Sequence, residues 1–463
     1  MKVIIIILQA ILNLARKRRD LIANRSKIPP EYRDDVVVWY SPKKQRLTNY
    51  DVIESYAEDF TYWTINNTSI TSAQKKIVIP AGTELEYVIA YRGFNASTDG
   101  FDIKYTGNIA ITYRYNKEDG TVGTIVIDKS GIYHLPASVR AQKNFGFYCN
   151  PQTTTEEATI EQLPTSILKD FSGNGLNAYM YGFQGKLNSG MGVYKFDFLS
   201  DLRINSAYLP YTERQDDKIC SLAGHPNGWL FQFTSLSDIP AFKVEVKGIV
   251  NDNFTYRWYD ENGNRGVDFV IDKDGIYEFP MSYSVETNTG VGIVCNNICQ
   301  DNVCFTQIPD YPNQLCYSGK EYCISYNQPI LTDYTVIADR TWFAKDSVRT
   351  FSSKYKDTTV KPGLFKFEWA VNNSEYTSSL GKDTSVTFSD GITWQTKTSY
   401  NGKALTNLQY EDGEHLIIGD YAEKIGNYYI GCHDDIIILK RSLTINEIND
   451  ITEAIFNEII IEE

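Results

Sequence analysis

The chain has 463 residues and a net charge of −13, with 33 Tyr and 22 Phe but only 4 Met and 4 His. Its length exceeds one ordinary hydrophobic core, so we expect two to four domains. Aromatic and β-branched residues suit pleated strands, and the Gly, Asn and Asp between them suit hairpin turns, so composition predicts a mainly β protein. An acidic body excludes a general nucleic-acid binder, whose affinity depends on neutralising phosphates.

The first 33 residues have the opposite charge to the rest. They contain eight basic residues against Asp20 and Glu31, a local charge of +6 that leaves −19 for the remainder. A basic head on an acidic body suits docking of one end onto an acidic surface.

Residues 3–15 are almost entirely apolar, and three interpretations compete. A secretion signal fits the apolar run, but basic residues 16–19 stand where a small-residue cleavage site belongs. A membrane span is not expected, because 13 helical residues reach about 20 Å of the roughly 30 Å required. Isoleucines at heptad spacing favour a coiled-coil helix that joins three or more chains rather than two. We favour this assembly helix within a 1–33 anchor, which predicts a homotrimer and involves Ile4, Ile7, Ile11, Leu14, Arg16, Lys17, Arg18 and Arg19.

A long internal repeat follows. The sequence FDIKYTG at 101–107 matches FKVEVKG at 242–248, and VIDKSGIY at 126–133 matches VIDKDGIY at 270–277. Apolar and polar residues alternate within these runs, which is typical of strands with one buried face. The sequence therefore predicts duplicated small antiparallel β-sandwich modules, at 34–164 (repeat copy 101–164) and 165–309 (repeat copy 242–309).

The remaining segment, 310–463, carries a family resemblance. Asp170-x-Ser-Gly-Asn-Gly175 resembles the opening of laminin-G-like, concanavalin-type jelly rolls, and 434–443 with 444–448 resembles their last strand and short helix. The resemblance implies a jelly roll over 310–463, with opening elements supplied from 36–60 and 165–200. It implies little about the ligand.

A second resemblance concerns a lineage. Residues 38–44 (VWYSPKK) and 186–192 (KLNSGMG) resemble segments of virion proteins of crAss-like phages of gut Bacteroides. This resemblance implies a virion fibre or structural protein at the capsid or tail surface, attached through its N-terminus to a capsid or other virion protein. We favour a head fibre, because the anchor is short and no long shaft follows. A tail fibre or receptor-binding protein, and a bacterial surface glycan-binding protein, remain the alternatives.

Catalytic groups are sparse. Glycosidases of the concanavalin type carry Glu-x-Asp-x-x-Glu on one strand, a spacing that this sequence lacks, and two carboxylates must flank the scissile bond at about 5–10 Å. Glu368 is a lone acid, and Asp434 and Asp435 are adjacent, so they point to opposite faces of a strand. No histidine has metal-site or nucleophile spacing. We therefore predict no enzymatic activity and no cofactor.

Aromatic residues of the C-terminal segment are candidates for glycan binding, since aromatic faces stack on sugar rings. The alternative is that the same residues fill the jelly-roll core. Several weak sites on one oligomer would gain avidity for host or mucin glycans. The candidates are Trp342, Trp369, Tyr376 and Trp394.

Cysteines cluster between 295 and 323. Cys295, Cys299 and Cys304 could form part of a zinc site, although no Cys-x2-Cys pair is present. Disulfides and free thiols are the alternatives. The first repeat copy retains only Cys149, so the module does not require a metal, and a cytosolic folding compartment favours free thiols.

Overall fold

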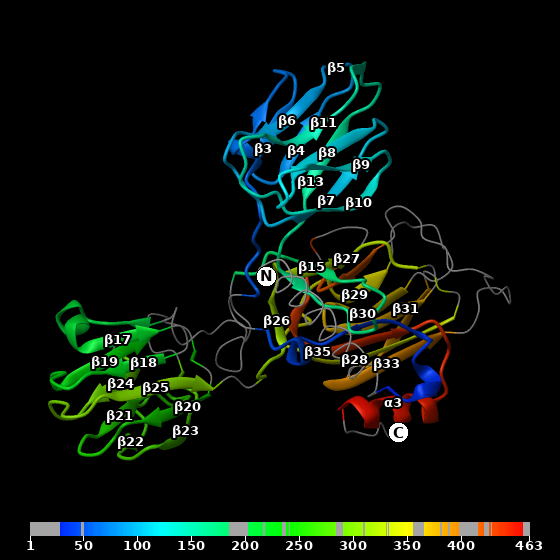
Figure 1. The fold of residues 1–463 in the computed structure, drawn as a ribbon. Helices are drawn as coiled ribbons and strands as arrows, with labels where there is room; N and C mark the ends of the chain where they lie inside the picture. Colours follow the sequence, from blue (N-terminus) through cyan, green and yellow to red (C-terminus); the bar gives the residue numbers. More distant parts are fainter. Residues whose placement is uncertain are drawn as a thin grey trace, which may run out of the picture.

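The computed structural model describes residues 28–47, 51–184, 202–215, 218–233, 238–239, 241–283, 290–308, 311–329, 331, 333–354, 365–379, 382–387, 389–397, 415–420, 426 and 428–456. Three β bodies occupy these ranges (Figure 1). The chain is a mainly β protein of several sandwich modules, as composition predicted. The helical segments within these ranges are short: η1 (Pro30–Tyr32), α2 (Pro42–Gln45), η2 (Phe60–Tyr62), η3 (Ser206–Tyr211) and α3 (Ile445–Phe456). In the described ranges no helix has both the length and the hydropathy needed to cross a bilayer. The assembly helix predicted from residues 4–19 lies outside the described residues.

The largest body is a jelly roll of two sheets. One sheet has the order β1 (Val36–Tyr40), β35 (Ile430–Leu439), β28 (Tyr334–Trp342), β33 (Gly391–Lys397), with β26 (Leu315–Ser318) also paired to β35. The other has the order β14 (Ile167–Leu168), β15 (Ala178–Tyr181), β27 (Tyr322–Ser325), β34 (Leu416–Ile418), β29 (Arg349–Lys354), β30 (Phe365–Val371), β31 (Ser374–Ser379), β32 (Lys382–Val386).

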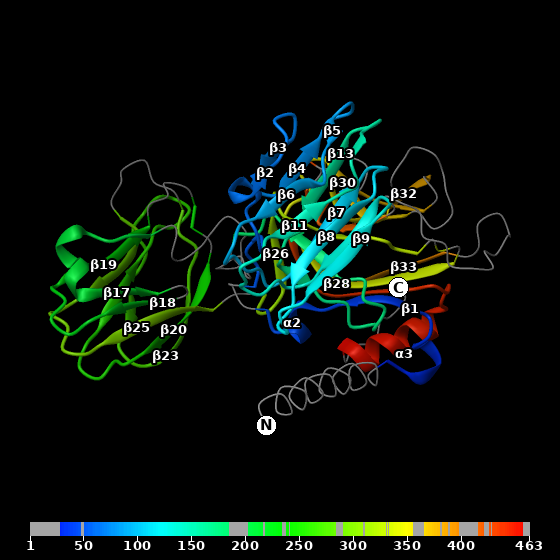
Figure 2. The same ribbon diagram turned by 45° about the horizontal axis from the view of Figure 1, so that its top comes forward.

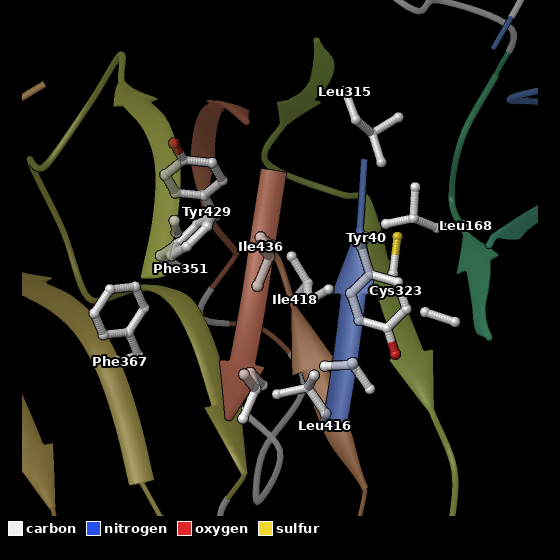
Figure 3. Packing of buried hydrophobic residues seen from close by; sticks show 14 of the residues in the cluster. Tyr40, Leu168, Leu315, Cys323, Phe351, Phe367, Leu416, Ile418, Tyr429 and Ile436 are labelled. Atoms are coloured by element: carbon white, nitrogen blue, oxygen red, sulfur yellow. The ribbon is translucent and has the colours of Figure 1, made fainter. Parts of the chain in front are cut away.

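The central strand β35 shows why this sheet forms. All ten of its residues are buried, because both of its faces are covered. Ile436 (Figure 3) and Ile438 belong to the core between the two sheets, whereas Ile437 and Leu439 pack in a second cluster with Ile448 of α3 on the outer side. A strand buried on two faces reads as a continuous apolar run rather than an alternating one. Figure 2 shows α3 lying along this sheet beside β1.

The first repeat copy is a separate sandwich inserted between β1 and β14 of the jelly roll. Its sheets have the orders β2 (Thr64–Ile65), β6 (Val88–Arg92), β11 (Phe145–Tyr148), β8 (Ile111–Asn116), β9 (Val122–Ile127) and β10 (Gly131–Leu135), β7 (Phe101–Thr106), β13 (Ala158–Gln162), β4 (Lys76–Ile79), β3 (Thr71–Ala73), with β5 (Glu84–Leu85) pairing β12 (Gln152–Thr153).

The second copy is inserted between β15 and β26 and repeats the same topology. Its sheets have the orders β16 (Leu202–Arg203), β19 (Gly228–Phe233), β24 (Gly292–Cys295), β21 (Phe254–Arg257), β22 (Phe269–Ile271) and β17 (Thr212–Gln215), β18 (Lys218–Ser221), β25 (Val303–Ile308), β20 (Phe242–Lys247), β23 (Gly275–Phe279). Each strand has its counterpart in the first module, so the duplication extends about forty residues upstream of the segment in which the sequences still match.

Strand pairing moves two of the expected domain boundaries. Residues 36–40, expected at the start of the first module, form β1 and pair with β35, with Trp39 opposite Ile437. Residues 178–181, expected in the second module, form β15 and pair with β27. The jelly roll is therefore assembled from three separated stretches of chain, in keeping with the opening elements that the family resemblance implied.

Candidate ligand-binding pocket

A pocket of about 340 Å³ lies where the first module meets the jelly roll. The edge strand β10 of the module and its neighbour β7 face β15 and β27 of the jelly roll there (Figure 1). Its lining is polar and aromatic and consists of Asp102, Ile132, His134, Gly175, Leu176, Asn177, Tyr179, Tyr326 and Asn327.

A carboxylate joins the two bodies at this pocket. Asp102 and His134 are directly opposite each other on β7 and β10, and His134 Nδ1 lies 2.7 Å from Asp102 Oδ1. The second carboxylate oxygen accepts a hydrogen bond of 2.7 Å from the hydroxyl of Tyr179, which belongs to β15. Asp102 is thus held from both sides, and its carboxylate has lone pairs that a ligand hydroxyl can still reach.

Two tyrosine rings form the aromatic part of the lining. The rings of Tyr179 and Tyr326 have centroids 5.8 Å apart, and the Tyr326 hydroxyl lies 3.1 Å from that of Tyr181. The ammonium of Lys104 is 5.5 Å from the Tyr326 ring centre. Burial raises the pKa of Tyr326 to about 12 and also raises that of Tyr179, so both hydroxyls are neutral near pH 7. The Tyr179 hydroxyl already donates to Asp102, so towards a ligand it can only accept a hydrogen bond.

The loop that closes the pocket is built on Asp170. Its carboxylate accepts from the backbone N–H groups of Trp39, Ser172 and Leu176 at 2.8–3.1 Å, which ties the loop to β1. Asn177 Oδ1 accepts from Asp170 N at 2.9 Å, leaving its amide nitrogen as the donor that a ligand can use. The motif that suggested a laminin-G-like opening therefore fixes the loop that carries Gly175, Leu176 and Asn177.

An apolar cluster beside the pocket holds the two bodies together. Leu163 and the half-buried Ile132 of the first module pack with Ile324, Ile417 and Tyr181 of the jelly roll. The equivalent of Ile132 in the second module is Ile276, which is 68 % exposed. Packing against the jelly roll thus distinguishes the first copy from the second.

The four aromatic residues expected to bind glycans are not brought together. Trp342 is 6 % exposed, its ring packs edge-on against Tyr429 at 4.7 Å, and its Nε1 lies 3.3 Å from Glu368 Oε2. A ring enclosed in this way offers no face to a sugar, so the prediction for Trp342 is wrong.

The other three occupy two different sheets. Trp369 and Tyr376 are a cross-strand pair on β30 and β31, half-buried, with ring centroids 5.0 Å apart. Trp394 is on β33 and packs against the apolar cluster beneath α3. None of the three lines the pocket described above, and their contact with glycans stays a prediction.

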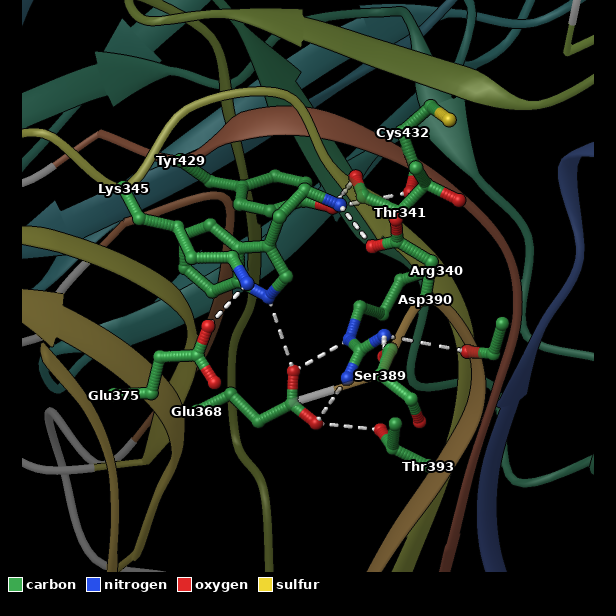
Figure 4. Close-up of polar contacts among 12 residues, drawn as sticks. Arg340, Thr341, Lys345, Glu368, Glu375, Ser389, Asp390, Thr393, Tyr429 and Cys432 are labelled. Carbon is green, nitrogen blue, oxygen red and sulfur yellow. Dashed lines mark hydrogen bonds and ion pairs between the residues drawn. The ribbon is translucent and has the colours of Figure 1, made fainter. Parts of the chain in front are cut away.

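The acidic residues considered for catalysis are buried and engaged. Glu368 is 3 % exposed and forms a bidentate ion pair with Arg340, with Nε–Oε2 at 2.5 Å and Nη2–Oε1 at 2.8 Å (Figure 4). Its backbone has φ +59°, at a bulge in β30 that turns it inward beside buried Phe367. Asp434 and Asp435 are both more than nine-tenths buried. The lack of enzymatic activity stays a prediction.

The three cysteines considered for a zinc site do not form one cluster in the structure. Cys304 forms a disulfide with Cys220, its cross-strand partner, so it is neither a free thiol nor a ligand. Cys295 and Cys299 are free and buried, and the third side chain that joins them is His225, 70 residues earlier than Cys295. Sequence spacing gave no signal for this histidine, because strand pairing brings it to the cluster.

No protein-family model matches the chain, and no curated protein matches it. Among solved structures, it has a weak similarity to the N-terminal CBM22-1-CBM22-2 tandem domain of Xyn10C from Paenibacillus barcinonensis. The identity is 6 % and the TM-score 0.15, over 60 % of this chain and 91 % of that one. A TM-score this low supports no inference about function.

Proposed function

We propose that this chain is a non-enzymatic binding protein that holds carbohydrate in the pocket between its first sandwich module and its jelly roll. One observation carries the proposal: two tyrosine rings, a carboxylate, an imidazole and two amides line the same pocket. A sugar presents C–H groups on one side and hydroxyls at its edge, so it suits aromatic faces bordered by neutral and anionic hydrogen-bonding groups.

The size of the pocket indicates what class of sugar would fit. At about 340 Å³ it lies at the small end of the range of roughly 300–1,000 Å³ for ligand pockets. That volume suits the end of an oligosaccharide rather than a long chain. A site this small binds a glycan end weakly by itself, so several copies on one particle would be needed for firm adhesion.

Glycan-array screening of the full chain, followed by calorimetric titration with the best glycan, tests this proposal. The informative variant is Asn327→Gly, because Asn327 is exposed and has φ +56°, a conformation that glycine keeps while losing the amide. We expect at least tenfold weaker binding. The control is Tyr62→Ala, which removes an aromatic ring that is 72 % exposed outside the pocket and should leave affinity unchanged. Equal affinity for Asn327→Gly and wild type would contradict the assignment.

We further propose that the chain acts at the surface of a virion, as a head fibre or a related decoration. This rests on the sequence resemblances of residues 38–44 and 186–192 and on the basic, apolar N-terminus. In the fold, 38–44 runs from β1 into α2, where Ser41 accepts a hydrogen bond from Lys44 N, so this segment is part of the jelly roll itself. Residues 186–192 lie outside the described residues. Mass spectrometry of purified particles, together with the solution mass of the chain with and without residues 1–28, tests attachment and trimer formation.

A further inference from the structure

One imidazole and two thiols that could bind a metal ion are buried together in the second module. His225 lies in the loop after β18, Cys295 ends β24, and Cys299 lies in the loop before β25. Their ligating atoms are within 4.8 Å of one another, and Cys295 Sγ is 3.3 Å from His225 Nδ1. All three side chains are at least 97 % buried.

The first module provides an internal control for this cluster. Gly82 N donates to Thr154 O at 2.8 Å and Thr154 N to Thr83 O at 3.0 Å. In the second module, Gly224 N donates to Cys299 O at 2.7 Å and Cys299 N to His225 O at 2.9 Å. The backbones are thus equivalent, with Thr83 and Thr154 at the positions of His225 and Cys299.

Both threonine hydroxyls donate hydrogen bonds to Pro80 O, whereas one nitrogen of the histidine has no partner among the described residues. Thr83 N donates to Thr154 Oγ1 at 2.8 Å, and Thr154 Oγ1 donates to Pro80 O at 2.7 Å. His225 Nδ1 lies 2.8 Å from Pro226 O, but its Nε2 is buried without a hydrogen-bond partner among the described residues. A buried polar atom left unpaired costs about 1–3 kcal/mol, a cost that the threonine pair of the first module does not carry.

We propose that His225, Cys295 and Cys299 bind one zinc ion in the second module. Two thiolates and a neutral imidazole cancel the charge of Zn²⁺, so the occupied site is neutral and compatible with complete burial. Tetrahedral bonds of about 2.3 Å to sulfur and 2.0 Å to nitrogen place ligand atoms about 3.5–3.8 Å apart. Here Cys295 Sγ and His225 Nδ1 are 3.3 Å apart, and all three ligating atoms lie within 4.8 Å of one another. Monovalent copper would leave a net negative charge in the same place.

A fourth polar side chain lies beside the two thiols. Ser221 Oγ lies 3.1 Å from Cys299 Sγ and 4.0 Å from Cys295 Sγ, so its neutral hydroxyl is placed to be the fourth ligand.

The metal content of the full, untagged chain purified with added zinc is the first measurement. We expect one zinc per chain, and after exchange with cobalt we expect a thiolate-to-cobalt charge-transfer band and tetrahedral d–d bands. The matched variant is His225→Thr with Cys299→Thr, which reproduces the first module's pair on an equivalent backbone and should therefore fold. It should lose the zinc and both cobalt signals.

A thiol control keeps the test specific. Cys149→Ser removes the first module's counterpart of Cys295 and should retain one zinc. Three results would each overturn the assignment. The wild-type chain could contain no zinc, the double threonine variant could retain zinc, or mapping of the unreduced chain could reveal a Cys295–Cys299 disulfide.

Discussion

The buried pair Arg340–Glu368 offers the sharpest test of what holds the two jelly-roll sheets together. Arg340 on β28 and Glu368 on β30 come from opposite sheets and are 0 % and 3 % exposed. The carboxylate also accepts from Thr393 Oγ1 at 2.5 Å and from Trp342 Nε1 at 3.3 Å. Each carboxylate oxygen of Glu368 thus accepts two hydrogen bonds. The buried charge of each residue is balanced by that of the other. The perturbation is Glu368→Gln, which preserves shape and backbone but removes the negative charge.

The expected loss follows from the burial of both groups. Removing one partner leaves the guanidinium without a counter-charge in the interior, which costs about 3–5 kcal/mol. Arg340→Met should lower the free energy of unfolding by a similar amount, since it leaves the buried carboxylate without a counter-charge. The double variant Arg340→Met with Glu368→Gln leaves no charge, so its loss should be at least about 2 kcal/mol smaller than the sum of the single losses.

Denaturant unfolding followed by tryptophan fluorescence measures these differences, because Trp342 is in contact with Glu368. The control is Arg265→Met, which breaks an exposed ion pair with Asp268 in the second module and should cost less than about 1 kcal/mol. If the two single losses simply add in the double variant, the pair does not act as a unit, and the reasoning is refuted.

Three further predictions concern other parts of the chain. Burial raises the pKa of Asp435 to about 7, so the folded state favours its protonated form. That contribution is complete below pH 4 and is lost as the pH rises through 7, so the jelly roll should be less stable at pH 8 than at pH 5 by at most about 3 kcal/mol. Thermal melts of Asp435→Asn should lack most of this dependence. The Cys220–Cys304 disulfide closes a separation of 84 residues, so reduction should destabilise the second module by up to about 4–5 kcal/mol in chemical denaturation, and an unchanged midpoint in reductant would contradict this. Gly292→Ala should unfold the same module in circular-dichroism melts, because its Cβ would lie 2.3 Å from a backbone oxygen, while Gly93→Ala meets nothing within 4 Å and should melt like wild type.

Local patterns predicted the classes of structure well. The alternation in Phe242–Lys247 gives a strand with one buried face, and its copy Phe101–Thr106 has the same burial pattern. The continuous apolar run at Ile436–Leu439 also reads as a strand, and the structure gives the reason, since both of its faces are covered.

Sites formed by distant segments were the part that sequence could not locate. Asp102 and Tyr179 meet only because the first module is inserted between β1 and β14, and nothing in either local sequence records that contact. His225 reaches Cys295 through strand pairing rather than through motif spacing. Trp342 was misassigned because composition cannot distinguish an aromatic ring enclosed in a core from one facing solvent.

The pairing of Trp39 with Ile437 sets an order of events during synthesis. The ribosome must add about 400 residues after β1 before its neighbour β35 exists, which takes roughly 20–80 s at about 5–20 residues per second. Both inserted sandwiches are finished in that interval and can fold before their host. Chains that stop before residue 430 would therefore carry two folded modules on an incomplete jelly roll. Such chains lack the long buried strand β35, and β1 is left unpaired and open to aggregation.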